Sequence, residues 1–277
     1  MIDRITLIGA GRVGGALARR FRTRDLRVGQ VYSRTPARAE AVAREVDAQP
    51  ISQLDELHPD ADLYLLAVPD DAIETVAHRL ASQLPRDVRI AHCSGATPLA
   101  VLTAHFPRAG IFYPLQSFVG HRAPDWNTLP LCVHATSEPG LEALAQLARR
   151  IAEQVHRVND TQRAALHVAA VFVNNFTNHL YGVGEQLTRA ADLPFALLLP
   201  LIRETTARLG TTPARQLQTG PAARGDTRTM QRHLALLAGQ PAYQALYRVL
   251  SDAIAGPPGP YPPGPPEGGM PGGKVDG

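Results

Sequence analysis

The sequence predicts an α/β fold, in which a doubly wound parallel Rossmann sheet is followed by an all-α C-terminal domain. Over residues 1–157, short β-rich apolar runs alternate with helical stretches. That order is typical of a parallel sheet with helices on both faces. A glycine-rich turn joins the first run to the first helix, and from Asp160 onwards long helical patterns follow one another without β-rich runs.

The predicted strands are short runs rich in β-branched and other apolar residues. They cover residues 4–10, 28–34, 61–69, 88–95, 109–115, 129–136 and 156–158, and the helices between them cover 13–22, 37–46, 72–80 and 140–155. One doubly wound domain, residues 1–157, accounts for all of these segments.

The second half, residues 158–255, is predicted to be a helical domain. Residues 161–191 run for about thirty residues without proline, far beyond a typical globular helix. A second helical pattern over 195–210 is interrupted by Pro200, and two more helices follow. Asp226 has the chemistry of an N-cap, while Pro241 and Gly256 suit the start and the stop of the last helix. The Pro/Gly-rich tail, 256–277, is expected to be disordered.

The composition disfavours several classes of protein, including nucleic-acid-binding, metal-binding and membrane-spanning proteins. The net charge is only +3 and the basic residues are scattered, which disfavours nucleic-acid binding. Cys93 and Cys132 follow no metal spacing, so no metal site is expected, and no apolar run reaches the length of a membrane span. We therefore expect a cytoplasmic protein. Lys274, in the tail, is the single lysine, so lysine acid–base or Schiff-base chemistry is not expected in the folded part.

The glycine-rich turn has the spacing of a dinucleotide fingerprint. Its glycines follow a strand, open a helix and precede a second strand that ends about twenty residues later, as the fingerprint requires. Gly9 would permit the tight turn, Gly11 would let the backbone approach a pyrophosphate, and Gly14 would let the helix pack on the strand. The predicted cofactor contacts are Gly9, Ala10, Gly11, Arg12, Val13 and Gly14.

The end of the second strand favours NADP over NAD. An acidic residue there would bind the ribose hydroxyl of NAD, whereas this chain has Ser33, Arg34 and, one helical turn on, Arg38. Arginine pairs with a 2′-phosphate that a carboxylate would repel. The alternative is that Arg34 and Arg38 are merely solvated. Val68 and Pro69, after the third strand, are further candidate cofactor contacts, although Pro69 could be a plain turn former.

Several motifs together resemble a known family. The segments GAGRVG, AVPDDAI, HCSG, YPLQSF and TGPAARGDTRTMQRHL are similar to proteins with a Rossmann-like NADP-binding domain and a conserved C-terminal helical domain of unknown function. That family resembles pyrroline-5-carboxylate reductase, deazaflavin-dependent NADP oxidoreductases, ketopantoate reductase and the 6-phosphogluconate dehydrogenase group. The resemblance implies a reductase and a C-terminal domain of the 6-phosphogluconate dehydrogenase type. It also implies a homodimer, with residues 158–255 as the substrate and dimerisation domain. Some of those relatives use a helix lysine followed by asparagine, and that lysine is missing here.

The first long helix carries a polar line on an otherwise apolar surface. At 100° per residue, His167, Asn174, Asn178, Tyr181 and Glu185 fall near one line. His167 would take roughly the place of the relatives' lysine and could give a proton to a reduced carbonyl or imine. We expect it at the junction of the two domains, facing the nicotinamide. The alternative is a satisfied, partly buried histidine. Asn174 and Asn178 could orient a carbonyl or carboxylate, or pair across a dimer.

Three further residues complete the predicted site. His92 and Ser94 end a strand on the cofactor side, where His92 could bind substrate and Ser94 could act in catalysis. Both could instead be structural. Arg224 is a candidate for binding a substrate carboxylate, and Asp226 more plausibly caps a helix than acts in catalysis.

These residues predict an NADPH-dependent oxidoreductase that reduces a small carbonyl or imine compound carrying a carboxylate. The alternative is a catalytically silent NADP-binding sensor or partner module. Neither reading identifies the substrate.

Overall fold

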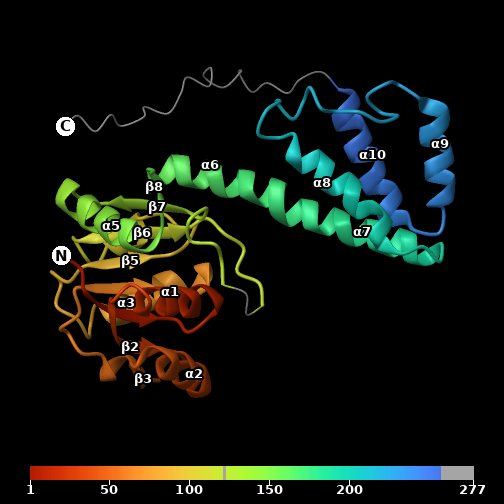
Figure 1. The fold of residues 1–277 in the computed structure, drawn as a ribbon. Helices are drawn as coiled ribbons and strands as arrows, with labels where there is room; N and C mark the ends of the chain where they lie inside the picture. Colours follow the sequence, from red (N-terminus) through yellow and green to blue (C-terminus); the bar gives the residue numbers. More distant parts are fainter. Residues whose placement is uncertain (121–122, 257–277) are drawn as a thin grey trace. The chain divides into compact units, whose positions relative to one another are not determined.

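The computed structural model describes residues 1–120 and 123–256, so the predicted disorder of the tail falls almost wholly outside the described residues. The chain divides into two compact units, Met1–Thr177 and Asn178–Gly277. The first contains an eight-stranded sheet in the order β3-β2-β1-β4-β5-β6-β7-β8 (Figure 1). The predicted domain boundary at 157/158 stays a prediction.

The sheet is the predicted Rossmann sheet with an antiparallel addition. Strands β1 (Arg4–Ile8), β2 (Arg27–Tyr32), β3 (Gln49–Ile51), β4 (Leu63–Leu66), β5 (Ile90–His92) and β6 (Ala109–Pro114) pair in parallel. Strand β7 (Pro130–Ala135) runs antiparallel to β6, and β8 (Gln154–Arg157) is parallel to β7. Strand β3 was not among the predicted strands, because it is a three-residue edge strand that contains Pro50.

Two apolar layers cover the sheet. One contains α1 (Arg12–Arg22), α2 (Pro36–Val46) and α5 (Glu138–Ile151), and the other contains α3 (Ile73–Leu80) and α4 (Ala100–Thr103). Alternate strand residues serve the two layers, since Leu65 packs in the first and Leu66 in the second. A short 3₁₀ turn at Leu54–Glu56 precedes β4, and another at Asp70–Ala72 precedes α3.

The helical half begins at α6 (Asp160–Ala170), where Asn159 and Gln162 form a capping box. A π-helical turn, Val171–Phe176, then leads directly into α7 (Thr177–Ala190). The long predicted helix is therefore present, with a π turn inside it. The remaining segments are a 3₁₀ turn (Phe195–Leu198), α8 (Leu199–Ala207), α9 (Thr227–Leu236) and α10 (Pro241–Ala255).

Two predicted helix ends are confirmed. The Asp226 carboxylate accepts a hydrogen bond from the Thr229 backbone N–H at 3.0 Å and so caps α9. Pro241 begins α10. The pattern over 195–210 is divided near Pro200, as predicted, into a 3₁₀ turn, Phe195–Leu198, and α8, which begins at Leu199 and has Pro200 in its first turn. None of the helices in the described ranges, 1–120 and 123–256, is long and apolar enough to span a membrane.

Candidate active site

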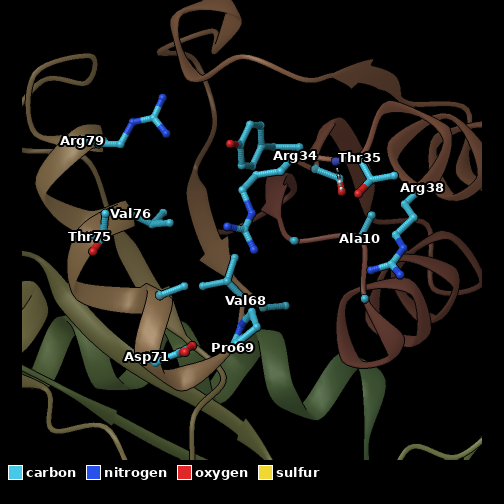
Figure 2. A pocket seen from close by; sticks show the side chains of 16 residues that line it. Ala10, Arg34, Thr35, Arg38, Val68, Pro69, Asp71, Thr75, Val76 and Arg79 are labelled. Atoms are coloured by element: carbon cyan, nitrogen blue, oxygen red, sulfur yellow. Dashed lines mark hydrogen bonds between the residues drawn. The ribbon is translucent and has the colours of Figure 1, made fainter.

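A cleft of about 470 Å³ lies at the carboxyl ends of β1, β2 and β4, the edge of the sheet where open α/β folds bind ligands (Figure 2). Eight of the eleven predicted cofactor contacts line it, namely Gly9, Ala10, Gly11, Ser33, Arg34, Arg38, Val68 and Pro69. Arg12, Val13 and Gly14 belong to α1 and do not line the cleft. Arg12 lines a different hollow, of about 230 Å³, beside Trp126.

The glycines have the geometry that the fingerprint requires. Gly9 has φ +117°, a conformation that other residues rarely adopt, and a Cβ there would lie 2.4 Å from the Ala67 carbonyl oxygen. A Cβ on Gly14 would lie 1.9 Å from the Gly9 carbonyl oxygen, so glycine lets α1 pack against the turn. A Cβ on Gly11 would meet no atom within 4 Å, because that position faces open space. This cradle fits a pyrophosphate.

The start of α1 also suits an anion. Its N-cap, Gly11, provides no side-chain hydrogen bond, and the first turn has no acidic residue. Its first backbone N–H groups therefore keep their capacity to bind phosphate, with the helix dipole in support.

Three arginines line the part of this cleft away from the glycine turn. Arg34 and Arg38 come from the β2 end and α2, and Arg79 comes from α3 on the opposite wall (Figure 2). The Ser33 hydroxyl accepts a hydrogen bond from the Thr35 backbone N–H at 3.2 Å. Sequence reasoning missed Arg79, because it occupies an ordinary exposed position of an amphipathic helix. Three guanidinium groups make this end of the cleft suitable for a phosphate.

A second cleft, of about 520 Å³, lies within the first unit. Polar and titratable residues that line it are Asp70, Cys93, Ser94, Tyr113, Gln116, Ser117, His167, Asn174 and Asn175. Pro69 lines the first cleft and Asp70 the second, so one turn after β4 borders both. Burial raises the pKa of the Cys93 thiol far above its usual range, which keeps it protonated and unsuited to nucleophilic chemistry.

His167 lies beside Tyr113 in this cleft. Its Nδ1 lies 3.2 Å from the Tyr113 hydroxyl, and the two rings meet edge to face with centroids 6.2 Å apart. Burial raises the pKa of Tyr113, so its hydroxyl keeps its proton near neutral pH. The hydroxyl oxygen can accept a hydrogen bond from Nδ1–H of a protonated imidazole, which leaves Nε2–H free to be donated.

Gly95 allows the loop after β5 to approach His167 and Tyr113 closely. A Cβ at Gly95 would lie 2.4 Å from His167 Nδ1 and 2.8 Å from Tyr113 Cζ. The loop after β5 therefore packs directly against the imidazole. A larger residue at position 95 would displace the imidazole ring.

The π turn changes which asparagines face this cleft. An ideal α-helix predicts His167, Asn174 and Asn178 on one line, but the wider turn shifts the register of the residues that follow it. Asn174 and Asn175 line the cleft, and Asn178 does not. The Thr177 hydroxyl donates to the Phe172 carbonyl, five residues earlier, at 3.2 Å. Sequence periodicity missed Asn175 because it assumed 100° per residue throughout.

The other predicted residues take different places. Ser94 lines the cleft and its hydroxyl accepts hydrogen bonds from the backbone N–H groups of Ala96 and Thr97, at 3.1 and 2.8 Å. His92 is fully buried and does not line either cleft; its Nδ1 accepts a hydrogen bond from the Ser94 N–H at 3.2 Å. Burial and the Arg163 charge lower the pKa of His92 to about 4. Arg224 lies in the second unit and is exposed. The functional roles given to these residues remain predictions.

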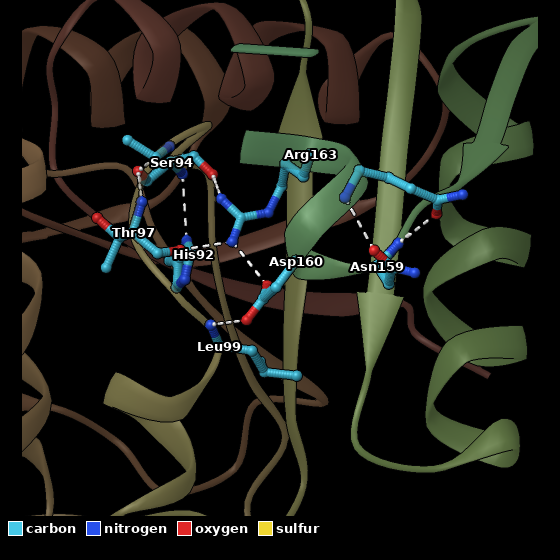
Figure 3. Close-up of polar contacts among 9 residues, drawn as sticks. His92, Ser94, Thr97, Leu99, Asn159, Asp160 and Arg163 are labelled. Atoms are coloured by element: carbon cyan, nitrogen blue, oxygen red, sulfur yellow. Dashed lines mark hydrogen bonds and ion pairs between the residues drawn. The ribbon is translucent and has the colours of Figure 1, made fainter. Parts of the chain in front are cut away.

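Sequence reasoning also missed a buried arginine (Figure 3). The Arg163 side chain is 1% exposed and pairs with Asp160 at 2.7 Å. It also donates to the Ser94 and Thr97 carbonyl oxygens, at 2.8 and 2.6 Å. An arginine in the first turns of a predicted helix looks like an exposed residue, and no sequence signal places the β5 loop over it.

Comparison with known proteins agrees with this geometry. Residues 4–92 match the family described as NADP oxidoreductase, coenzyme F420-dependent, and residues 129–254 match a domain of unknown function, DUF2520. Searching the curated proteins gave no match.

Among solved structures, a protein from Bacteroides fragilis assigned as an NADP oxidoreductase is 35% identical to this chain. The match covers 92% of this chain and 98% of that protein, with a TM-score of 0.86. The chain belongs to this oxidoreductase family. The membership confirms the resemblance to a Rossmann-like NADP-binding domain with a helical domain of unknown function, and with it the expected class of enzyme and cofactor.

Two more distant structures share the fold. A Thermotoga maritima protein is 23% identical, with a TM-score of 0.68 and coverage of 90% of this chain and 96% of that one. A reductive aminase from Aspergillus terreus, solved with NADPH and ethyl-5-oxohexanoate, is 17% identical, with a TM-score of 0.65 and coverage of 92% and 96%. Together with the sheet order, these similarities confirm the predicted fold class.

Proposed function

We propose that this NADP oxidoreductase reduces a small carbonyl or imine compound with NADPH. The proposal rests on the observation that one turn after β4 borders both clefts, because Pro69 lines the glycine and arginine cleft and Asp70 lines the His167 cleft. A dinucleotide whose phosphates lie on the Gly9–Gly11 turn would direct its adenosine end toward the arginines and its other end toward Asp70.

The residues of the first cleft bind and select the cofactor. The Gly11 backbone and the first turn of α1 would hold the pyrophosphate, because neither a side chain nor a cap competes for those N–H groups. Arg34 and Arg38 would bind the 2′-phosphate, and Val68 and Pro69 would contribute apolar contacts to the cofactor at the carboxyl end of β4. When bound, NADPH would supply a hydride to an electrophilic carbon of the substrate.

His167 donates the proton to the oxygen or nitrogen atom of the reduced bond. The Tyr113 hydroxyl contacts Nδ1, which leaves Nε2 as the nitrogen that would give this proton. A protonated imidazole is a common general acid in enzymes. Ser94 and the amides of Asn174 and Asn175 orient the substrate. Asn178, outside this cleft, is the weaker candidate for that role.

The substrate carboxylate predicted from the sequence stays part of this proposal, with Arg224 as its candidate partner. The described residues that line the His167 cleft include no arginine or lysine.

A homodimer through the helical half is the second part of the proposal. Among the described residues, Ala222 and Leu237 are the only buried hydrophobic residues of the second unit. Large apolar side chains there are exposed, including Leu197 at 61%, Leu201 at 66% and Leu236 at 82%. Helices that expose this much apolar surface need a partner surface to bury it.

The experiment is NADPH oxidation followed at 340 nm against cyclic imines and keto acids, each acid with its methyl ester. With any substrate found, His167→Asn should lower turnover by about 10²–10⁴-fold, the usual effect of removing a general acid. NADPH affinity should be unchanged. His179→Asn, an exposed histidine of α7, is the matched control. Turnover of His167→Asn within twofold of wild type would contradict the role of His167. NADPH binding without any oxidation would favour the silent sensor.

A further inference from the structure

Arg163 is the largest fully buried side chain of the described residues, and it carries a charge. Its guanidinium contacts Asp160, the Ser94 carbonyl oxygen and the Thr97 carbonyl oxygen (Figure 3). The second oxygen of Asp160 accepts the Leu99 backbone N–H at 2.8 Å. The first turn of α6 therefore ties the loop after β5 at three backbone positions.

That loop is also the wall behind His167. Gly95, directly after the carbonyl that Arg163 holds, packs against the imidazole and the Tyr113 ring. Arg163 and His167 are four residues apart on α6 and share one face of the helix. One face of α6 thus carries both His167, the proposed proton donor, and Arg163, which fixes the loop after β5 against His167.

Stability alone is a weak reason for this arrangement. Burying a guanidinium costs desolvation that an ion pair often only offsets, and apolar residues of similar volume can be as stable. The Arg163 Nε is buried without a hydrogen-bond partner among the described residues, so the desolvation is not fully compensated. The planar, multidentate geometry of the contacts to two carbonyl oxygens instead suits a group that defines a position.

We infer that Arg163, paired with Asp160, is a positioning residue for His167. It holds the Ser94–Thr97 segment in place, so that Gly95 stays packed against both the His167 imidazole and the Tyr113 ring. This packing maintains the ring orientation that the proposed proton transfer needs. This inference rests on the proposed function of His167 for its purpose, but its geometric content can be tested without a substrate.

The test is NMR of protein labelled with ¹⁵N in the histidine rings, with the His167 signals assigned by their loss in His167→Asn. Arg163→Lys keeps the charge but cannot bind both carbonyl oxygens in the same fork, and Asp160→Asn keeps the shape but removes the counter-charge. In both variants we expect the His167 Nδ1 resonance to move toward that in Tyr113→Phe, where the hydroxyl partner is removed.

Arg89→Lys is the matched control, since Arg89 also donates to a backbone carbonyl oxygen, that of Asp62, away from the His167 cleft. It should leave the His167 signals unchanged. If Arg163→Lys and Asp160→Asn lower the melting temperature while the His167 signals stay at their wild-type positions, Arg163 is only structural and the inference is wrong. If those signals move but His167→Asn retains full turnover, the positioning stands and the proposed role of His167 fails.

Discussion

Burial controls the charge of His92, which lies at the end of β5 under the loop that borders the candidate active site. The ring is fully buried, and both desolvation and the nearby Arg163 charge lower its pKa from 6.5 to about 4. In the unfolded chain the same ring takes up a proton near pH 6.5. The folded protein therefore binds fewer protons than the unfolded chain between these two values.

This difference predicts a pH dependence of stability. The contribution of His92 is fully present above about pH 6.5 and is lost as the pH falls to about 4, by on the order of 3 kcal/mol. Urea unfolding at a series of pH values should show this loss, and His92→Gln should flatten it. His156→Gln, at an exposed position, is the control. An equally steep loss in His92→Gln would contradict the assignment.

Cofactor selection is also decided by single side chains. Arg34→Asp should reverse the preference of the protein from NADPH to NADH, because the carboxylate repels the 2′-phosphate and can accept the ribose hydroxyls. In wild type, NADPH should bind at least about tenfold tighter than NADH, the effect of losing one or more charge-assisted hydrogen bonds. Arg44→Asp, on α2 but outside the cleft, is the control for changed net charge. Equal wild-type affinities in a titration would contradict the role of Arg34.

At the scale of elements, the loop after β5 and the π turn determine the shape of the second cleft. Gly95→Ala should displace the His167 ring, because the new methyl carbon would lie 2.4 Å from Nδ1. We expect a lower melting temperature and a shifted His167 NMR signal. Gly182→Ala, in α7, where a Cβ meets nothing within 4 Å, should instead stabilise its helix by up to about 1 kcal/mol. An unperturbed His167 signal in Gly95→Ala would show that the loop yields and does not position the ring.

These two elements also mark where sequence reasoning reaches its limit. The glycine turn between β1 and α1 could be predicted because the fingerprint is local, with strand, turn and helix adjacent in the chain. The contact of Gly95 with His167 joins residues 72 positions apart, and no local pattern reports it. The π turn was missed because the pattern was read at 100° per residue throughout, and the residues of Val171–Phe176 include no proline or glycine to mark a change of helix type.

At the scale of the whole molecule, the two units differ in how much apolar surface they bury. The first has two apolar layers around its sheet, and its strands could be predicted from buried runs. The second has amphipathic helices with few buried positions in the described structure, so its helices were predictable but their packing was not. The missing burial is the physical reason to expect a second copy of the chain.

Light scattering should therefore give about twice the mass of one chain at micromolar concentration. Replacing Leu197 and Leu201 with glutamate should shift the protein toward the monomer, since charged side chains would prevent burial of that surface. The same change at the exposed Val119 of the first unit is the control. A monomeric wild type would contradict the dimer.

The central claim is that the protein uses NADPH to reduce a carbonyl or imine compound. Isotope transfer tests this claim most directly. The wild-type protein is incubated with NADPH carrying deuterium at C4 of the nicotinamide, in turn on each face, and with the panel of imines and keto acids. The account predicts a product with one deuterium on the reduced carbon, from one face only, and loss of this product in His167→Asn while NADPH still binds. Saturable NADPH binding with no deuterated product from any compound of the panel would contradict it.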